Sequence, residues 1–185
     1  PKVESRIGDP LSPYAASKFT NEVYAGTFER CYGLETVGLR YFNVYGPRQK
    51  PDGPYAAVIP LFMDALLKDR APFINGDGEQ SRDFTFVSNA VQANIRGMFT
   101  SVSGASGKAY NIAVGERATV NQLFQTLQSL TGATVDAVYR DPRDGDVKHS
   151  LADISLAQEY LNYQPCTRFE EGLEITLDWF RKRFG

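Results

Sequence analysis

The sequence predicts an α/β fold, in which helices alternate with the strands of a parallel sheet. A helical pattern over residues 14–32 leads directly into a mostly apolar stretch, ETVGLRYFNVYGP, which indicates a buried strand that ends at Asn43. A helix followed at once by a buried strand is half of a β-α-β crossover, the unit that builds parallel sheets. With 185 residues, 42% of them hydrophobic, the chain can form a substantial core in one domain or two small ones.

The first helix has clear start and stop signals. Ser12 is a favourable N-cap, Pro13 suits the first helical position, and Gly33 suits the C-cap. Tyr14 then lies in the first turn, and Lys18 follows four residues later on the same helix face. Side chains four apart have Cβ atoms about 5–6 Å from each other, so the phenol and the ammonium can act on one small volume. A surface tyrosine and lysine with no shared role would give the same spacing.

The later elements follow from hydrophobic periodicity and from Gly, Pro and Ser punctuation. A Ser88 cap is expected to open the helix over 88–102, while Thr119 and Gly132 bound the helix over 119–132. After a Pro/Gly-rich loop at 47–56, we expect helices over 56–69, 88–102, 119–132, 153–163 and 168–184, and short strands within 72–78, 82–87, 108–114 and 135–141.

Composition narrows the function classes. The 20 basic and 22 acidic residues are well mixed and give a net charge of −2, so no nucleic-acid face or polybasic membrane patch is indicated. No apolar run approaches the roughly 20 residues of a membrane span. Cys31 and Cys166 are too far apart for a zinc motif or a disulfide framework, which favours reduced, structural thiols, no metal and a cytoplasmic location.

The start of the chain suggests a fragment. It begins PKVESRIGDP, with neither an initiating Met nor a signal-peptide pattern. The glycine-rich fingerprint that binds a dinucleotide after a first strand is also missing: GDGEQ and SGASG contain glycines without its spacing or its strand-to-helix setting.

Polar candidates for a ligand site occur in loops and at strand ends. Asn43 follows the first strand, where open α/β sheets bind ligands, although it could equally serve as a turn residue before Gly46 and Pro47. Arg82 and Arg143 could grip a phosphate, and Asp146 could accept hydrogen bonds from sugar hydroxyls; each could instead form a surface ion pair. His149, the single histidine, has no partner motif and is interpreted as solvated or structural.

Four motifs in order, SPYAASK, LRYFNVYGPRQ, NGDGEQSRDF and RDGDVKHSLAD, resemble the extended short-chain dehydrogenase/reductase family and, within it, the UDP-sugar 4-epimerases. The resemblance covers essentially the whole chain and is strongest to bacterial UDP-N-acetylglucosamine 4-epimerases. It implies the C-terminal part of a Rossmann-like doubly wound parallel sheet plus a smaller α/β substrate-binding domain. Residues 1–50 would belong to the NAD-binding domain and 51–185 mainly to the nucleotide-sugar domain, with 84–115 returning to the Rossmann part; the N-terminal NAD-binding half would be missing.

By this resemblance Tyr14 is the catalytic acid/base and Lys18 its partner, which also contacts the nicotinamide ribose of NAD. A phenol with a pKa near ~10 needs about 4 kcal/mol of differential stabilisation to work as a phenolate near neutrality. The lysine charge and the oxidised nicotinamide can supply it. The implied reaction removes the proton of the sugar 4-hydroxyl and the C4 hydride, turns the bound 4-keto sugar, and returns hydride to its other face.

The resemblance also implies roles for other residues. Tyr41 matches the position near the nicotinamide and Asn43 the contact to the sugar diphosphate. The further substrate-binding positions are the diphosphate arginines Arg82 and Arg143, the ribose contact Asp146, the uracil site Phe73 and Asn75, and the pocket wall Ala57, Val58 and Phe62. Ser150 matches a wall position where a small residue leaves room for an N-acetyl group, which favours conversion of UDP-N-acetylglucosamine to UDP-N-acetylgalactosamine.

Alternatives remain at this stage. A nucleotide-sugar 4,6-dehydratase or decarboxylase of the same family shares these motifs, and the chain alone could be a non-catalytic nucleotide-sugar-binding fragment. The family typically forms homodimers through a helix bundle that includes the Tyr14 helix. The segment NEVYAGTFERCY, with apolar residues on more than one side, permits that homodimer here.

Overall fold

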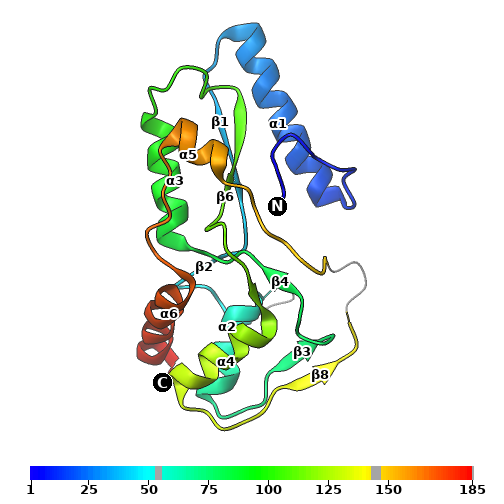
Figure 1. The fold of residues 1–185 in the computed structure, drawn as a ribbon, viewed down its shortest axis with the longest axis vertical. Coiled ribbons are helices and arrows are strands. Elements are labelled where there is room, and N and C mark those ends of the chain that lie inside the picture. Colours follow the sequence, from blue (N-terminus) through cyan, green and yellow to red (C-terminus); the bar gives the residue numbers. More distant parts are fainter. Residues whose placement is uncertain (53–55, 143–146, 185) are drawn as a thin grey trace.

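The computed structural model describes residues 1–52, 56–142 and 147–184 and shows an elongated α/β arrangement (Figure 1). Arg143 and Asp146 lie outside the described residues. The helices are α1 (Pro13–Tyr32), α2 (Val58–Leu67), α3 (Val87–Phe99), α4 (Val120–Thr131), α5 (Ser155–Leu161) and α6 (Phe169–Phe184). The strands are β1 (Val37–Tyr41), β2 (Val44–Tyr45), β3 (Phe73–Asn75), β4 (Ser81–Arg82), β5 (Thr85–Phe86), β6 (Lys108–Ile112), β7 (Ala118–Thr119) and β8 (Val138–Arg140).

Parallel pairing confirms the predicted α/β class. Strand β1 pairs with β6 from Val37 opposite Lys108 to Tyr41 opposite Ile112, and both β2–β5 and β3–β8 are also parallel. Only the short β4–β7 pair among the described ladders is antiparallel. Two parallel strands need a crossover connection between them. The chain that links β1 to β6 includes α2 and α3.

The chain changes its pairing partner directly after β1. We expected one strand to Asn43, but β1 ends at Tyr41, and β2 pairs with β5 instead of β6. Asn43 takes a positive φ of 37°, a conformation that Asn tolerates better than most residues. The amide of Phe42 still donates to Ile112, so the break falls at Asn43 itself.

The capping predictions for two helices are confirmed. The Ser12 side chain accepts from the amide of Ala15 at the start of α1, and Gly33 ends that helix in the left-handed region. Helix α4 begins with a capping box between Thr119 and Gln122 and ends at Gly132. The prediction for α3 was wrong: it begins at Val87 with no side-chain cap, because the strand β5 runs straight into it.

The molecule has two apolar cores, one at each end. One lies between α2, α4 and α6 and contains Phe62, Met63, Leu123, Leu127 and Leu177. The other packs α3 and α5 against β1 and β6, around Tyr110, Ile112 and Tyr163. In Figure 1 the helices α2, α4 and α6 lie at the lower end, and α3, α5, β1 and β6 lie at the upper end. A ligand that bound across both ends would therefore contact two parts of the molecule that have separate cores.

Helix α1 differs from the others because none of its residues, all of which are described, is buried. Its apolar side chains Phe19, Val23, Tyr24 and Phe28 are exposed. Within the described ranges, no helix is long and apolar enough to cross a membrane. Cys31 and Cys166 are both free and exposed, so the expectation of structural thiols is not supported by burial.

Helix α6 approaches β2 closely at Gly172. The Tyr45 hydroxyl donates to the carbonyl of Phe169 at 2.8 Å, and this bond draws the first turn of α6 onto the tyrosine. A Cβ at position 172 would collide with that hydroxyl and lie 2.9 Å from Phe86. Only a residue without a side chain fits this contact.

We therefore predict that Gly172→Ala lowers the free energy of unfolding by about 1–3 kcal/mol, because overpacking outweighs the better helix propensity of alanine. Gly26→Ala in α1 is the matched control, since its Cβ would meet only the flexible end of Arg30 at 3.2 Å. Urea unfolding measures both. A Gly172→Ala chain as stable as the Gly26→Ala chain would contradict the close packing.

Candidate functional site

Tyr14 and Lys18 face one cavity, as their spacing predicts. The Lys18 Nζ lies 5.4 Å from the centroid of the Tyr14 ring. Both residues line a cavity of about 790 Å³ between α1, the N-terminal segment and β1, called the Tyr14 cavity below. The Tyr14 side chain is 72% exposed, so its hydroxyl is accessible to a ligand. A phenol next to a positive charge at the wall of an accessible cavity is suited to proton transfer.

The strand β1 determines which side chains face α1. Arg40 makes a two-pronged ion pair with Glu22 of α1, with N–O distances of 2.6 and 2.7 Å. Hydrogen bonding to Glu22 raises the pKa of Arg40, against the opposing effect of burial. The pair anchors α1, and so the helix that carries Tyr14, to the sheet.

Tyr41 was expected near the cofactor, and it lines the Tyr14 cavity. Its hydroxyl, however, is 3.0 Å from Oδ1 and 2.8 Å from Nδ2 of Asn94 on α3. Successive strand residues point to opposite faces, so Phe42 lies on the face of Arg40 and α1. Phe42 also lines the cavity and was missed, although strand alternation could have identified it.

A second cavity, of about 290 Å³, collects most of the predicted substrate-binding residues. It is called the Arg82 cavity, and the predicted residues that line it are Asn43, Ala57, Val58, Phe73, Asn75 and Arg82. They come from the turn after β1, the start of α2, and strands β3 and β4. The neighbours Phe42 and Asn43 line different cavities, so both cavities reach the end of β1.

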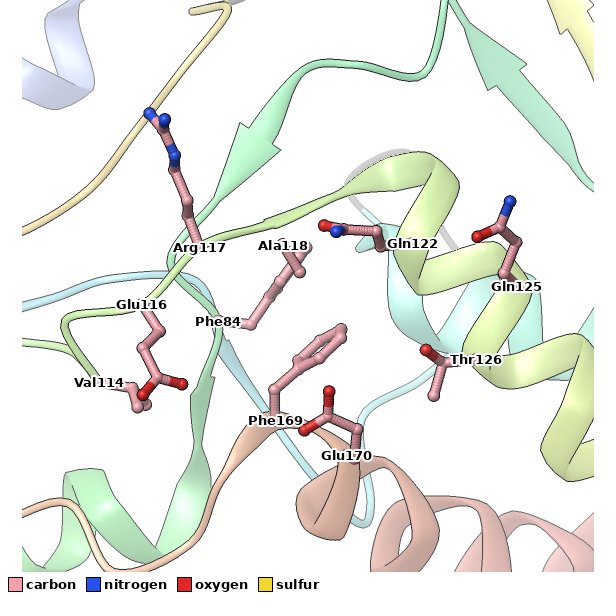
Figure 2. A pocket seen from close by; sticks show the side chains of 10 residues that line it. All are labelled: Phe84, Val114, Glu116, Arg117, Ala118, Gln122, Gln125, Thr126, Phe169 and Glu170. Atoms are coloured by element: carbon pink, nitrogen blue, oxygen red, sulfur yellow. The ribbon is translucent and has the colours of Figure 1, made fainter.

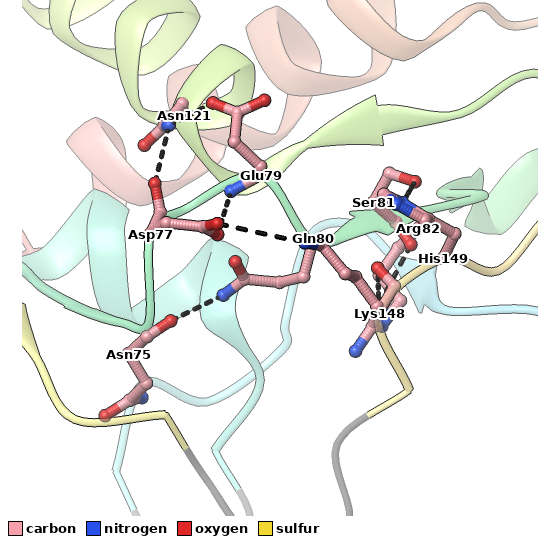
Figure 3. Close-up of polar contacts among 9 residues, drawn as sticks. All are labelled: Asn75, Asp77, Glu79, Gln80, Ser81, Arg82, Asn121, Lys148 and His149. Carbon is pink, nitrogen blue, oxygen red and sulfur yellow. Dashed lines mark hydrogen bonds and ion pairs between the residues drawn. The ribbon is translucent and has the colours of Figure 1, made fainter.

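Arg82 is held in a network of backbone contacts (Figure 3). Its Nη1 donates to the carbonyl of Ser81 at 2.9 Å and to that of Lys148 at 3.4 Å. Next to it, the Ser81 hydroxyl and His149 Nδ1 are 3.0 Å apart, and His149 is exposed. A guanidinium carries a permanent positive charge and five N–H donors in a planar fork, which suits it to binding an anion such as a phosphate.

Two of the described residues that were predicted to bind the substrate, Phe62 and Ser150, do not line the Arg82 cavity. Phe62 is 2% exposed and packs edge-to-face on Phe124 in the core, because it lies on the α2 face that meets α4. Ser150 is 7% exposed, and its amide donates to Ser81 at 3.0 Å, next to Arg82 in the chain. The proposed roles of Arg143 and Asp146 stay predictions, since neither is described.

The sequence interpretation missed Gln80, which also lines the Arg82 cavity. Its side-chain amide donates to the carbonyl of Asn75 at 2.7 Å, which ties the turn between β3 and β4 together (Figure 3). Gln80 and Arg82 are two apart on an extended segment and therefore share a face. The two-residue spacing of Gln80 and Arg82 in GDGEQSRDF could have indicated this shared face.

Figure 2 shows another cavity, of about 240 Å³, on the other side of Phe84. Phe84 lines both this cavity and the Arg82 cavity. Two of the polar side chains that line the cavity of Figure 2 have partners: Glu116 pairs with Arg168, and Gln122 completes the cap of α4. Arg117 points away from the space in the figure. None of the predicted site residues lines it.

Among the described residues, no group of three or more His, Cys, Asp or Glu side chains is arranged to hold a metal ion. The groups that line the two cavities include the phenol of Tyr14, the ammonium of Lys18, the amides of Asn43, Asn75 and Gln80, and the guanidinium of Arg82. These groups are suited to proton transfer and to binding an anion.

Comparisons with known proteins show the family of the chain. A sequence model of the GDP-mannose 4,6-dehydratase family matches residues 1–176. A putative UDP-glucose 4-epimerase of Methanocaldococcus jannaschii is 38% identical over 98% of this chain and 57% of its own length. The chain thus spans little more than half of such relatives.

Two solved structures match nearly the whole chain. The UDP-N-acetylglucosamine 4-epimerase of Methanobrevibacter ruminantium M1 is 44% identical with a TM-score of 0.93, over 100% of this chain and 58% of that one. The UDP-glucuronic acid 4-epimerase of Bacillus cereus, solved with UDP-glucuronic acid and NAD, is 30% identical with a TM-score of 0.89, over 99% and 57%. Since the family match covers residues 1–176, the chain belongs to the GDP-mannose 4,6-dehydratase family, within the short-chain dehydrogenases/reductases that its motifs resemble.

Proposed function

We propose that this chain is the substrate-binding and catalytic-tyrosine part of an NAD-dependent UDP-hexose 4-epimerase. The observation that carries the proposal is that the Tyr14 cavity and the Arg82 cavity both reach the end of β1, where Phe42 lines the first and Asn43 the second. One cavity offers an acid/base pair, and the other offers a cation and amides for a nucleotide diphosphate. The epimerases to which the chain is similar support this assignment.

The two cavities suit the two parts of such a substrate. The Arg82 cavity is lined by residues fixed in strands and by hydrogen bonds, which favours a tight grip on the uridine diphosphate. A 4-keto sugar has to turn before hydride returns to its other face, and a fixed anchor on the diphosphate would keep it bound while it turns.

The residues of the Tyr14 cavity fit one end of NAD. Lys18 can donate to ribose hydroxyls, and the Phe42 ring offers an apolar surface at the end of β1. Bound NAD would accept the C4 hydride and give it back. Tyr14 removes the proton from the 4-hydroxyl and later returns it, while the charge of Lys18 stabilises the phenolate.

We favour UDP-N-acetylglucosamine and UDP-N-acetylgalactosamine as the substrate pair. The family resemblance implies that a small residue at position 150 leaves room for an N-acetyl group, and Ser150 bonds through its amide to Ser81, next to Arg82. The similarity to a UDP-N-acetylglucosamine 4-epimerase supports this choice. UDP-glucose and UDP-galactose would be poorer substrates.

A 4,6-dehydratase or decarboxylase is the second candidate, because the matching family model is that of a dehydratase. Mass spectrometry of the product separates the reactions. An epimerase leaves the mass of the nucleotide sugar unchanged, a dehydratase removes water, and a decarboxylase removes carbon dioxide.

We further propose that residues 1–50 and 84–115 complete the NAD-binding domain and that most of 51–185 forms the nucleotide-sugar domain. The core around β1 and β6 supports this division and adds α5 to the first part. The exposed apolar side chains of α1 suit a helix bundle with a second copy in a homodimer. Two free thiols suit a cytoplasmic enzyme.

We predict that this chain binds UDP and that Arg82→Gln weakens binding about 10- to 100-fold, because a charge-assisted hydrogen bond to phosphate is lost. Calorimetric titration of the chain with UDP measures the affinity. Arg117→Gln, an exposed arginine at the cavity of Figure 2, is the matched control and should leave it unchanged. Equal weakening by both variants would argue against the Arg82 cavity.

We predict that Tyr14→Phe in a full-length enzyme with this segment lowers kcat for epimerisation about 100- to 10,000-fold with little change in KM, because the acid/base group is lost. Tyr24→Phe, an exposed tyrosine of the same helix, is the control. The 185 residues alone, without a glycine fingerprint, should bind NAD poorly and show no turnover. Full activity of Tyr14→Phe would disprove the proton-transfer role, and turnover by the chain alone would disprove the second expectation.

We predict that Ser150→Tyr in the same enzyme abolishes turnover of UDP-N-acetylglucosamine and spares UDP-glucose, because the phenol fills the space of the acetyl group. Retained UDP-glucose turnover also shows that the variant folds. Ser150→Ala should convert both substrates normally. Undiminished activity of Ser150→Tyr on the acetylated sugar would remove the basis for the substrate choice.

A further inference from the structure

Asp83 lies between two residues of the Arg82 cavity, Arg82 and Phe84, but is itself fully buried. Its carboxylate accepts three backbone hydrogen bonds: from Val114 at 3.0 Å, from Gly115 at 3.1 Å and from Ala152 at 3.4 Å. The first two donors follow β6, and the third belongs to the segment 148–152. One side chain therefore joins two segments distant in sequence to the end of β4.

The segment 148–152 supports Arg82 directly. It runs beside β4 through bonds from the Ser81 amide to Lys148 at 2.9 Å and from the Ser150 amide to Ser81 at 3.0 Å. The hydrogen bond from the Ala152 amide to the Asp83 carboxylate adds one more contact to this pairing, through a side chain. The Lys148 carbonyl that accepts from the Arg82 guanidinium thus sits on a segment whose position the Asp83 carboxylate fixes.

Asn43 is attached to the same residue. Its side-chain amide donates to the Asp83 carbonyl at 3.0 Å, while the Thr85 amide donates to the Asn43 carbonyl at 3.3 Å. These bonds hold the positive-φ turn at Asn43, which lines the Arg82 cavity. The orientation of the Asn43 amide therefore depends on where the Asp83 backbone lies.

We propose that Asp83 is a positioning residue for the diphosphate of the substrate: by holding β6, the segment 148–152 and Asn43 in one arrangement, it aims Arg82 and Asn43 into the cavity. It does not touch the ligand. This inference rests on the proposed function, since it assumes that the Arg82 cavity takes a nucleoside diphosphate.

A carboxylate at this place has a stability cost, which argues for a role beyond packing. Burial raises the pKa of Asp83, and the hydrogen bonds from Val114, Ala152 and Gly115 only partly oppose that effect. A side chain selected only to fill space here would be apolar. Two acceptor oxygens are needed to reach donors on two different segments, and Asp provides both on a short stem.

The experiment compares Asp83→Asn with Asn89→Asp in the 185-residue chain. Asn89 is equally buried and holds another loop, accepting from the amides of Cys166 and Thr167 and donating to the Thr167 carbonyl at 2.8 Å. Each swap keeps the shape of the side chain and turns favourable polar contacts into unfavourable ones. UDP and uridine affinities are measured by calorimetry and ligand-detected NMR below the thermal midpoint of each variant.

We expect Asp83→Asn to weaken UDP about tenfold and to leave uridine within twofold, because the arginine and the amide that it aims contact only the diphosphate. Asn89→Asp should lower the thermal midpoint and leave UDP within twofold. If Asp83→Asn does not fold, Asp83→Glu, which keeps the charge but displaces it by one methylene, should show the same selective loss.

Three results would overturn the inference. They are unchanged UDP affinity in the folded Asp83 variant, equal loss of UDP and uridine, or equal loss in Asn89→Asp, which would reduce Asp83 to a structural residue. Failure of the unaltered chain to bind UDP would be recognised separately. It would overturn the proposed function of the cavity and this inference with it.

Discussion

The parallel pairing of β1 with β6 is the constraint on which the site depends. It fixes the end of β1, where the ladder bond from Phe42 to Ile112 is followed at once by the turn at Asn43. Because β2 then pairs with β5 instead of β6, the chain passes from one strand pair to another at this point. Both cavities reach this point, which is the position where open α/β sheets bind ligands.

The side chains of the Arg82 cavity and those of the Tyr14 cavity are held in different ways, and the proposed chemistry uses this difference. On the Arg82 side, side chains are fixed by backbone contacts and a buried carboxylate, so an anionic ligand meets oriented donors. On the Tyr14 side, the phenol and the ammonium stand on an exposed helix that the Arg40–Glu22 pair fastens to the sheet. A fixed anchor beside an open reactive pair is what a reaction with a rotating intermediate requires.

Local signals in the sequence predicted what local physics decides. The caps of α1, the shared face of Tyr14 and Lys18, and the α/β class depend on a few neighbouring residues or on simple periodicity. The break at Asn43 could not be predicted, because it depends on which distant strand pairs with β2. Phe62 was misplaced for another reason: the period of α2 already put it on the core face, and the family resemblance outweighed that signal.

The central claim is that a uridine diphosphate binds in the Arg82 cavity, beside the Tyr14 cavity. The most direct measurement is a two-dimensional ¹H–¹⁵N NMR titration of the labelled chain with UDP, which reports binding residue by residue. We expect the largest amide shifts at Asn43, Asn75 and Arg82. Shifts centred on residues 116–126 at the cavity of Figure 2, or no shifts at saturating UDP, would contradict it.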